Sequence, residues 1–214
     1  MSDFEEPVRV WQEVRDVGGI ILAGGQSRRM GANKALLQIN GQSLIDRVAS
    51  VLRRIFPEVI IIGGNLGSPT PFNLPSFQDL RPGAGSLGGI YTGLCRTRFP
   101  RAFCVACDMP FLSAPLIHHL TQADPAADVV IPRTNEGVQP LHAVYSRKCI
   151  PFIRKLLEQN HFKIIDFFHH VRIREVGEKE MCRHGWKPTS FFNINTREDL
   201  TRALELAGTE GMEA

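Results

Sequence analysis

Short apolar runs typical of buried strands alternate along this chain with segments whose apolar residues recur at helical spacing. The runs at 17–23, 59–62 and 102–107 are apolar along their whole length, as central strands of a parallel sheet are. Between them, residues 43–55 and 87–97 have the spacing of helices that bury one face. This alternation predicts an α/β fold with a mostly parallel central sheet covered by helices on both faces, in three α/β/α layers.

The second half of the chain continues this pattern less regularly. The expected elements are strands at 129–131 and 139–145, helices near 148–159 and 163–169, and a terminal helix capped by Thr196. A short strand is expected near Phe77, and a short strand or turn at 191–195. The segment 177–190 is expected to be irregular, because it is polar and its apolar residues recur at neither the helical nor the strand spacing.

Length and charge narrow the classes of protein to consider. A chain of 214 residues can form one substantial domain, which we expect at 17–208, with 1–16 as a peripheral extension and 209–214 as a tail. The formal net charge of +3 suits a polyanionic small ligand and is too small for a nucleic-acid footprint. No apolar run reaches the length of a membrane span, so we expect a cytoplasmic protein that binds neither nucleic acid nor membrane.

Polar clusters follow three of the predicted strands, after Ala23, Ile62 and Cys107. In a parallel sheet, ligands bind beyond the carboxyl ends of the strands, and these ends lie at one edge. The three clusters therefore predict a single site at that edge.

The loop from Gly24 to Lys34 has the composition of a phosphate-binding loop. It contains three glycines and three cations, namely Gly24, Gly25, Gly31, Arg28, Arg29 and Lys34. Glycines let backbone amides approach a phosphate, and three positive charges can neutralise a triphosphate. The loop is not a Walker loop, because Lys34 does not follow Gly31 directly and no Ser or Thr comes next. A flexible basic surface loop is the alternative, but a position directly behind a buried strand favours phosphate binding.

Asp108 ends the apolar run at 102–107. A carboxylate at the end of a buried strand is costly unless it is paired with a cation. Mg²⁺, which is bound in proteins through one or two carboxylates plus substrate phosphates, is the natural partner.

Other cysteines and histidines invite a metal or redox interpretation. Cys104 and Cys107 lie in one strand run, three residues apart, so we expect their side chains on opposite faces and without redox function. The adjacent pair His118-His119 is expected to be two solvated helix histidines. Cys182 and His184 would supply only half of a zinc site, and no second pair has suitable spacing.

The loop pattern LAGGxSxRMGxxK, from Leu22 to Lys34, resembles the signature loop of the MobA-type nucleotidyltransferases, which attach GMP to molybdopterin. The resemblance runs from about Gly18 to Ala207 and includes the segments Gly85-Ser-Leu-Gly-Gly89, Asp108-Met-Pro-Phe111, Pro140-Leu-His-Ala-Val-Tyr145 and Asn193-Ile-Asn195-Thr196. It implies a Rossmann-like nucleotidyltransferase fold. Two positions depart from the family pattern: Ser86 stands where proline is common, and Gly63 stands where some relatives carry an asparagine.

The resemblance also implies residue roles. Nucleotide-binding residues would be Leu22, Ala23, Gly24, Gly25, Lys34, Asn65, Asp79 and Asp108. Arg29, Lys34 and Asp108 would be catalytic, with Asp108 also holding Mg²⁺. Acceptor-binding residues would be Pro140, His142, Asn193 and Asn195.

The implied reaction transfers GMP from GTP to the terminal phosphate of molybdopterin, or of its molybdenum-loaded form, and releases pyrophosphate. The attacking phosphate is already anionic, so we expect no general base and no covalent enzyme intermediate. Positioning and charge stabilisation would supply the catalysis. Other molybdenum-cofactor biosynthesis proteins and acceptor enzymes are expected partners.

Alternatives remain open on the same scaffold. A cytidylyltransferase would use CTP, but Gly24-Gly25 favours guanine, because relatives that use CTP more often read Ala-Ala-Gly there. Sugar-phosphate nucleotidyltransferases are usually longer than 214 residues. A regulatory GTP-binding protein would need no acceptor site. Asn193 and Asn195 indicate that this chain has one, so they disfavour that alternative.

Overall fold

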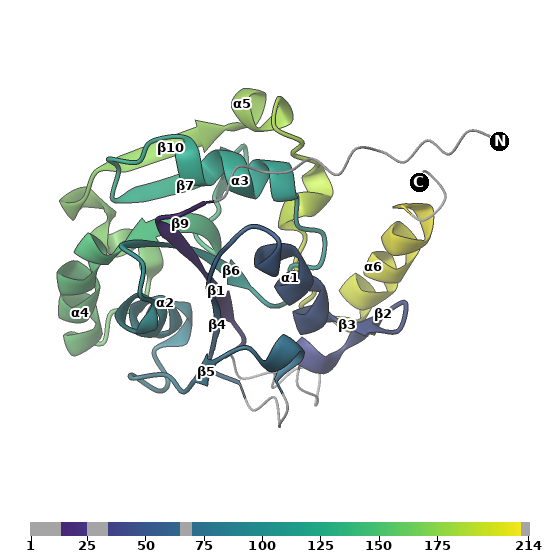
Figure 1. The fold of residues 1–214 in the computed structure, drawn as a ribbon, viewed down its shortest axis with the longest axis horizontal. Coiled ribbons are helices and arrows are strands. Elements are labelled where there is room, and N and C mark those ends of the chain that lie inside the picture. Colours follow the sequence, from purple (N-terminus) through teal and green to yellow (C-terminus); the bar gives the residue numbers. More distant parts are fainter. Residues whose placement is uncertain (1–13, 25–33, 65–69, 211–214) are drawn as a thin grey trace.

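The computed structural model describes residues 14–24, 34–64 and 70–210, built around an eight-stranded sheet in the order β10-β7-β9-β6-β1-β4-β5, with β8 beside β7 (Figure 1). The strands are β1 (Val17–Leu22), β4 (Val59–Ile62), β5 (Ser76–Phe77), β6 (Arg101–Ala106), β7 (Val129–Thr134), β8 (Gly137–Val138), β9 (His142–Ser146) and β10 (Ile173–Gly177). β1 pairs in parallel with β4 and β6, as β4 does with β5 and β7 with β10. β9 runs antiparallel between β6 and β7. The predicted mostly parallel sheet is confirmed.

Helices cover both faces of this sheet. They are α1 (Leu44–Arg53), α2 (Gly85–Arg96), α3 (Ala114–Gln122), α4 (Ile150–Glu158) and α5 (Glu178–Cys182), whereas a further helix, α6 (Arg197–Glu210), lies beside the sheet. The buried side chains of α1, α3 and α5 share one core with β1 and β6, and those of α2 and α4 form the core on the opposite face. The predicted three layers are therefore present. None of the helices in the described ranges is long and apolar enough to span a membrane.

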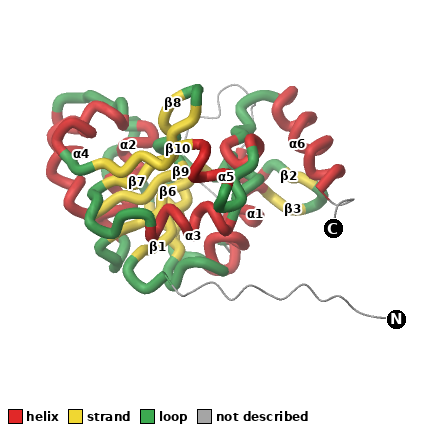
Figure 2. Tube along the Cα trace, turned by 90° about the horizontal axis from the view of Figure 1, so that it is seen from above, coloured by secondary structure: helices red, strands yellow, loops and turns green. Residues whose placement is uncertain are grey.

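A hairpin and α6 add a small third core beside the sheet. The hairpin strands are β2 (Gln38–Ile39) and β3 (Gln42–Ser43), which pair antiparallel. Ile39 of the hairpin is buried in one cluster with Phe111, Ile194 and Ala203 of α6. Figure 2 shows α6 lying beside β2 and β3, away from the main layers. This packing brings the last segment of the chain to the loop that follows β6.

Local signals in the sequence explain several helix ends. Ser43 accepts a hydrogen bond from the amide of Asp46 at 3.2 Å, as expected of an N-cap. Thr196 accepts from the amide of Asp199 at 3.1 Å, and the Asp199 carboxylate accepts from the Thr196 amide at 2.8 Å. This reciprocal pair confirms the predicted cap of α6.

The region 163–195 differs from the expectation. The predicted helix near 163–169 is a 3₁₀ helix, η4 (Ile164–His170), and residues 177–190 contain α5 and a second 3₁₀ helix, η5 (Pro188–Phe191). β10 was not predicted, because it is an edge strand in which only Val176 is fully buried. Its pairing with β7 stabilises it, and an apolar run is not required.

Near the N-terminus, the described residues reach further into the fold than expected. Val14 is buried in the core, and the Asp16 carboxylate lies 2.7 Å from the guanidinium of Arg101. Residues 14–16 therefore pack against the sheet, although the sequence assigns them to a peripheral extension.

The predicted placement of Cys104 and Cys107 on opposite faces of the sheet is confirmed. Cys104 and Cys107 are both free and buried, and they belong to the cores on opposite faces of the sheet. Burial raises the pKa of the Cys107 thiol to about 12, which keeps it protonated and unreactive.

Candidate active site

Hydrogen bonds tie the carboxyl ends of four neighbouring strands together. The amide of Ala23, after β1, donates to Ile62 of β4 at 2.9 Å, and the amide of Gly63 donates to Phe77 of β5 at 2.8 Å. The amide of Cys107, after β6, donates to Leu22 of β1 at 3.1 Å. The strand ends that precede the three polar clusters therefore lie together at one edge, as predicted.

Two glycines let the turns after β1 and β4 touch. A Cβ on Gly63 would lie 2.7 Å from the Gly24 Cα, and Gly63 has φ +73°. Both the backbone conformation and the close approach exclude a larger residue. The glycine at position 63, which departs from the family's asparagine, is thus required by the way this turn packs.

Asp79 lies against the same pair of turns. Its Oδ2 would be 3.2 Å from a Cβ on Gly24, and its Oδ1 is buried without a hydrogen-bond partner among the described residues. Burial raises the pKa of Asp79, and a hydrogen bond from Thr92 lowers it only in part. A buried acceptor without a partner is costly, so a ligand that brings N–H donors to this carboxylate would be bound favourably.

Lys34 lies between Asp108, which follows β6, and Asn195, near the C-terminal helix. It begins a 3₁₀ helix, η1 (Lys34–Leu36), and its Nζ donates to Asn195 Oδ1 at 2.9 Å. The same Nζ lies 3.8 Å from Asp108 Oδ2, and the two side chains are 20% and 19% exposed. Burial raises the pKa of Asp108, while the positive charge of Lys34 lowers it in part. The arrangement is a half-buried cation between a carboxylate and an amide.

The segment that carries Asn195 is held rigidly. The amide of Ile194 donates to the carbonyl of Asp108 at 3.0 Å, which ties this segment to the loop after β6. The Asp199 carboxylate accepts from the Asn195 amide at 2.9 Å. The side chain of Asn193 is oriented by its own bond to the Phe191 carbonyl at 3.0 Å. Asn195 is thereby placed against Lys34, and Ile194, between the two asparagines of the NxNT motif, against Asp108.

A cavity of about 500 Å³ opens beside Asn193. Its walls come from the β7–β8 turn, α5 and the segment 186–193. Its polar lining includes Asn135, Gln139, Glu178 and Asn193, and its aromatic lining includes Trp186 and Phe191. Trp186 Nε1 is buried without a partner among the described residues. The cavity can hold a flat, polar-edged molecule beside Asn193.

His142 lies behind the wall of this cavity. Its side chain is fully buried, with ring centroids 5.0 Å from both Phe103 and Phe191 in edge-to-face contacts. Burial lowers the pKa of His142 to about 3, and neither ring nitrogen has a partner in the described part of the chain. The structure therefore does not bring His142 to an acceptor. It supports Phe191 from within the core.

The remaining predicted residues are divided between the site and the core. Leu22 and Ala23 are buried, and the Leu22 carbonyl and the Ala23 amide are engaged in the hydrogen bonds between strand ends. The Pro140 carbonyl accepts the hydroxyl of Tyr145 at 2.7 Å. Gly25, Arg29 and Asn65 lie outside the described residues.

Apart from Asn193, the polar and aromatic residues that line this cavity, such as Asn135, Glu178 and Trp186, were not predicted as ligand contacts. The presence of a tryptophan, Trp186, in the polar segment 177–190 is the sequence signal that could have indicated this wall.

A mostly parallel sheet whose carboxyl edge gathers a glycine turn, a lysine and an aspartate defines a nucleotidyltransferase. The family model described as "MobA-like NTP transferase domain" matches residues 19–173. The chain belongs to this family.

Individual relatives agree with this assignment. A probable molybdenum cofactor guanylyltransferase from Pelotomaculum thermopropionicum is 42% identical over 189 residues, which cover 88% of this chain and 92% of the relative. The solved molybdopterin-guanine dinucleotide biosynthesis protein A from Archaeoglobus fulgidus is 26% identical, with a TM-score of 0.79 over 90% of this chain and 99% of that one.

A more distant solved structure, Rv0371C from Mycobacterium tuberculosis H37Rv, is described in complex with manganese. It is 20% identical, with a TM-score of 0.64 over 89% of this chain and 98% of that one, so the likeness shows the fold.

Proposed function

We propose that this chain transfers GMP from GTP to the terminal phosphate of molybdopterin, with or without its molybdenum, and releases pyrophosphate. The observation that carries the proposal is the position of Lys34, between Asp108 on the nucleotide side and Asn195 on the acceptor side. The names of the relatives as molybdenum cofactor guanylyltransferases support the same substrates.

The guanine base is bound through Asp79. Guanine has two adjacent donors, N1–H and the 2-amino group, and a carboxylate can accept from both. Cytosine and adenine lack this pair, because the ring nitrogen beside their amino group is an acceptor. Asp79, whose Oδ2 lies next to Gly24 and whose Oδ1 has no hydrogen-bond partner among the described residues, supports GTP over CTP and ATP.

The triphosphate is held by the glycine turn and by positive charge. Gly24 opens the turn after β1, and Lys34 closes the loop. Gly25 and Arg29 belong to the same proposed phosphate site, and Asn65 to the nucleotide site. Lys34 stabilises the negative charge that develops on the phosphates, and its bond to Asn195 fixes the position of the ammonium group.

The residues present fit a single Mg²⁺ held at Asp108. In the described part of the chain, the cation beside the partly buried Asp108 carboxylate is Lys34, at 3.8 Å, so a divalent ion would offset the remaining cost of burial. Among the described residues, no group of three or more His, Cys, Asp or Glu could enclose a metal. Substrate phosphates would therefore complete the coordination, as is typical of Mg²⁺. When bound, the ion supplies charge neutralisation at the α-phosphate.

The acceptor lies on the Asn193 side. Its pterin ring system occupies the cavity of about 500 Å³, where Asn135, Gln139 and Glu178 offer polar groups and Trp186 offers an aromatic surface. An oxygen of its terminal phosphate attacks the α-phosphorus of GTP. The new P–O bond forms as the bond to the bridging oxygen of pyrophosphate breaks, and no general base is needed.

The test is pyrophosphate release with Mg²⁺ and molybdopterin, with GTP, CTP and ATP compared. Release with GTP alone is expected, and Asp79→Asn should lower kcat/KM for GTP by about 10- to 100-fold, because the amide replaces one acceptor with a donor. A preference for CTP would contradict the base assignment. No release with any nucleotide would contradict the transfer itself.

A further inference from the structure

One wall of the cavity beside Asn193 is in contact with residues that do not line the cavity. This wall segment, residues 178–186, comprises α5 and the turn after it, and lines the cavity with Glu178 at one end and Trp186 at the other. Met181, between them, is fully buried and accepts from the amides of His184 at 2.9 Å and Trp186 at 3.1 Å. The turn is thus closed on itself, and its position depends on what it packs against.

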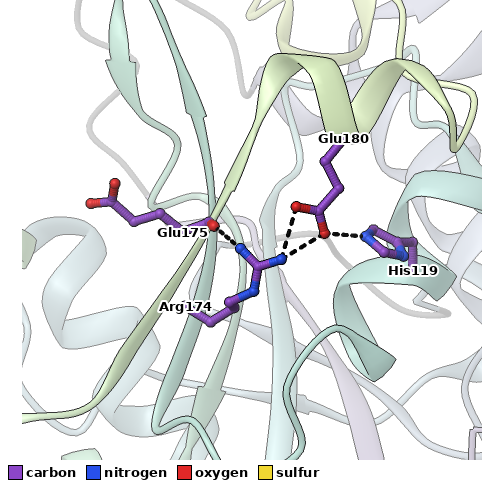
Figure 3. Close-up of polar contacts among 4 residues, drawn as sticks. All are labelled: His119, Arg174, Glu175 and Glu180. Atoms are coloured by element: carbon purple, nitrogen blue, oxygen red, sulfur yellow. Dashed lines mark hydrogen bonds and ion pairs between the residues drawn. The ribbon is translucent and has the colours of Figure 1, made fainter.

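Glu180 connects the wall segment to two other elements (Figure 3). Arg174 of β10 places its Nη2 2.8 Å from both oxygens of the Glu180 carboxylate. His119 of α3 places its Nε2 2.9 Å from Oε1 of the same carboxylate. Arg174 also donates to the backbone carbonyl of Glu175, which fixes the guanidinium between β10 and α5. One carboxylate therefore bridges a strand and a helix.

A second set of contacts continues along α3. The His184 ring stacks on the His119 ring with centroids 3.6 Å apart and planes 5° from parallel. The Ser113 hydroxyl donates to the Gly185 carbonyl at 2.8 Å. Gly185 has φ +74°, and a Cβ there would be 3.3 Å from Pro115. The turn therefore lies directly on the first half of α3.

The same helix is fixed relative to Asp108. α3 begins at Ala114, and the loop between Asp108 and its N-cap buries Met109 and Phe111 in the core. Across the cavity, Glu178 accepts from the Asn135 amide at 2.9 Å, which connects the wall segment to the β7–β8 turn. The wall segment is thus connected to the β7–β8 turn on one side and, through α3, to the loop that follows Asp108 on the other.

We propose that His119, Arg174, Glu180 and His184 are positioning residues for the acceptor, which hold Glu178 and Trp186 at a set distance from Asp108. The inference rests on the proposed function, in which the acceptor's ring system binds in this cavity. None of the four lines the cavity, and His119 and His184 face a separate hollow of about 280 Å³. Their effect on the acceptor passes through the wall segment.

The effect is expected on acceptor binding and not on folding. The four side chains are partly exposed, and partly exposed ion pairs contribute little to global stability. Loss of the network leaves the buried Met181 in place and frees the turn on either side of it.

Steady-state kinetics with the two substrates varied separately tests this. Glu180→Ala, Arg174→Ala and His119→Ala should each raise the KM for the acceptor about 10-fold and change the KM for GTP less than about 2-fold. His119→Gln, whose amide can still donate to Glu180, should recover part of the loss.

Arg172→Ala is the matched control. Arg172 lies two residues before Arg174 and makes an ion pair of 2.8 Å with Asp124, at the far end of β10. The control should leave both KM values unchanged. Equal rises in both KM values, no rise in the acceptor KM, or an equal effect of Arg172→Ala would each overturn the inference.

Fluorescence of Trp186 gives a readout that does not depend on transfer. The chain has two tryptophans, so the variants are made in a Trp11→Phe background. Glu180→Ala and Arg174→Ala should increase acrylamide quenching of Trp186, and Arg172→Ala should not. Unchanged quenching in both would overturn the positioning role, whereas no transfer by the unaltered chain would overturn the proposed function alone.

Discussion

Lys34 is the residue on which the two sides of the site depend, because a single ammonium group contacts Asn195 and faces Asp108. Asp79 and His142 show two other fates of a polar side chain. Asp79 is only partly buried and lies beside Gly24 at the edge of the sheet, whereas His142 is fully buried between aromatic rings. Neither Asp79 Oδ1 nor the His142 ring has a hydrogen-bond partner among the described residues; we propose a ligand contact for Asp79 and expect a cost in stability at His142.

Lys34→Ala should reduce GMP transfer by about 10²- to 10³-fold, because it removes a fixed positive charge from the phosphates. The fold should be retained, since Lys34 is not part of a core cluster. Transfer rates and circular dichroism check both points. Lys155→Ala, which removes an exposed lysine of α4, is the control and should remain active.

His142→Leu should reduce the decrease in the free energy of unfolding that occurs as the pH falls. The pKa of His142 is about 3 in the folded chain, below the ordinary value of 6.5, so the unfolded chain binds the proton first. This difference costs nothing above pH 6.5 and destabilises the folded chain as the pH falls below it, by about 2 kcal/mol at pH 5. Urea unfolding from pH 7 to pH 4 measures it. A parallel fall in both proteins would show that His142 titrates normally.

At the scale of elements, turns and edges decide the geometry of the site. The turns after β1 and β4 touch through Gly24 and Gly63. The edge strand β10 leads directly into α5, whose first residue, Glu178, lines the cavity. The antiparallel β9 lies between β6 and β7 and places Pro140 and His142 next to the strand that leads to Asp108.

Gly63→Ala should destabilise the fold by about 2–4 kcal/mol, because it combines a positive φ with a Cβ that meets backbone atoms. Gly41→Ala is the matched control. Gly41 has φ +77°, but a Cβ there would meet nothing within 4 Å, so about 1 kcal/mol is expected from the backbone conformation alone. Urea unfolding compares the two. Equal losses would mean that the turns after β1 and β4 can move apart freely.

At the scale of the whole molecule, substrate binding and folding are coupled. The proposed GTP site joins the ends of β1, β4 and β6 to the C-terminal segment that carries Asn195. A ligand that binds only the folded chain stabilises all of these parts together. We propose residues 17–208 as the nucleotidyltransferase domain, with residues 14–16 packed on it through Val14 and Asp16.

GTP with Mg²⁺ should raise the thermal unfolding temperature more than GTP with EDTA. At a ligand concentration 100 times the Kd, binding stabilises the folded state by about 2.7 kcal/mol. Asp108→Asn should respond to GTP but lose the increment due to Mg²⁺, because the amide is a poor ligand for the ion. If this variant kept the full increment, the metal would be held elsewhere.

The sequence alone determined the elements whose signals are local. β1, β4 and β6 follow from continuous apolar runs, and the caps of α1 and α6 follow from Ser43 and Thr196. Because parallel strands end at one edge, the positions of Asp108 and Lys34 in one site could also be predicted. These features depend on neighbouring residues and on rules that hold for any parallel sheet.

Only the tertiary structure decided what depends on residues far apart in the chain. β10 exists because it pairs with β7, and His142 is buried because Phe103 and Phe191 close around it. The wall of the cavity is set by contacts between α3 and residues 180–185, about 60 positions later. Such contacts have no periodic pattern in the sequence, since each partner is selected by packing in three dimensions.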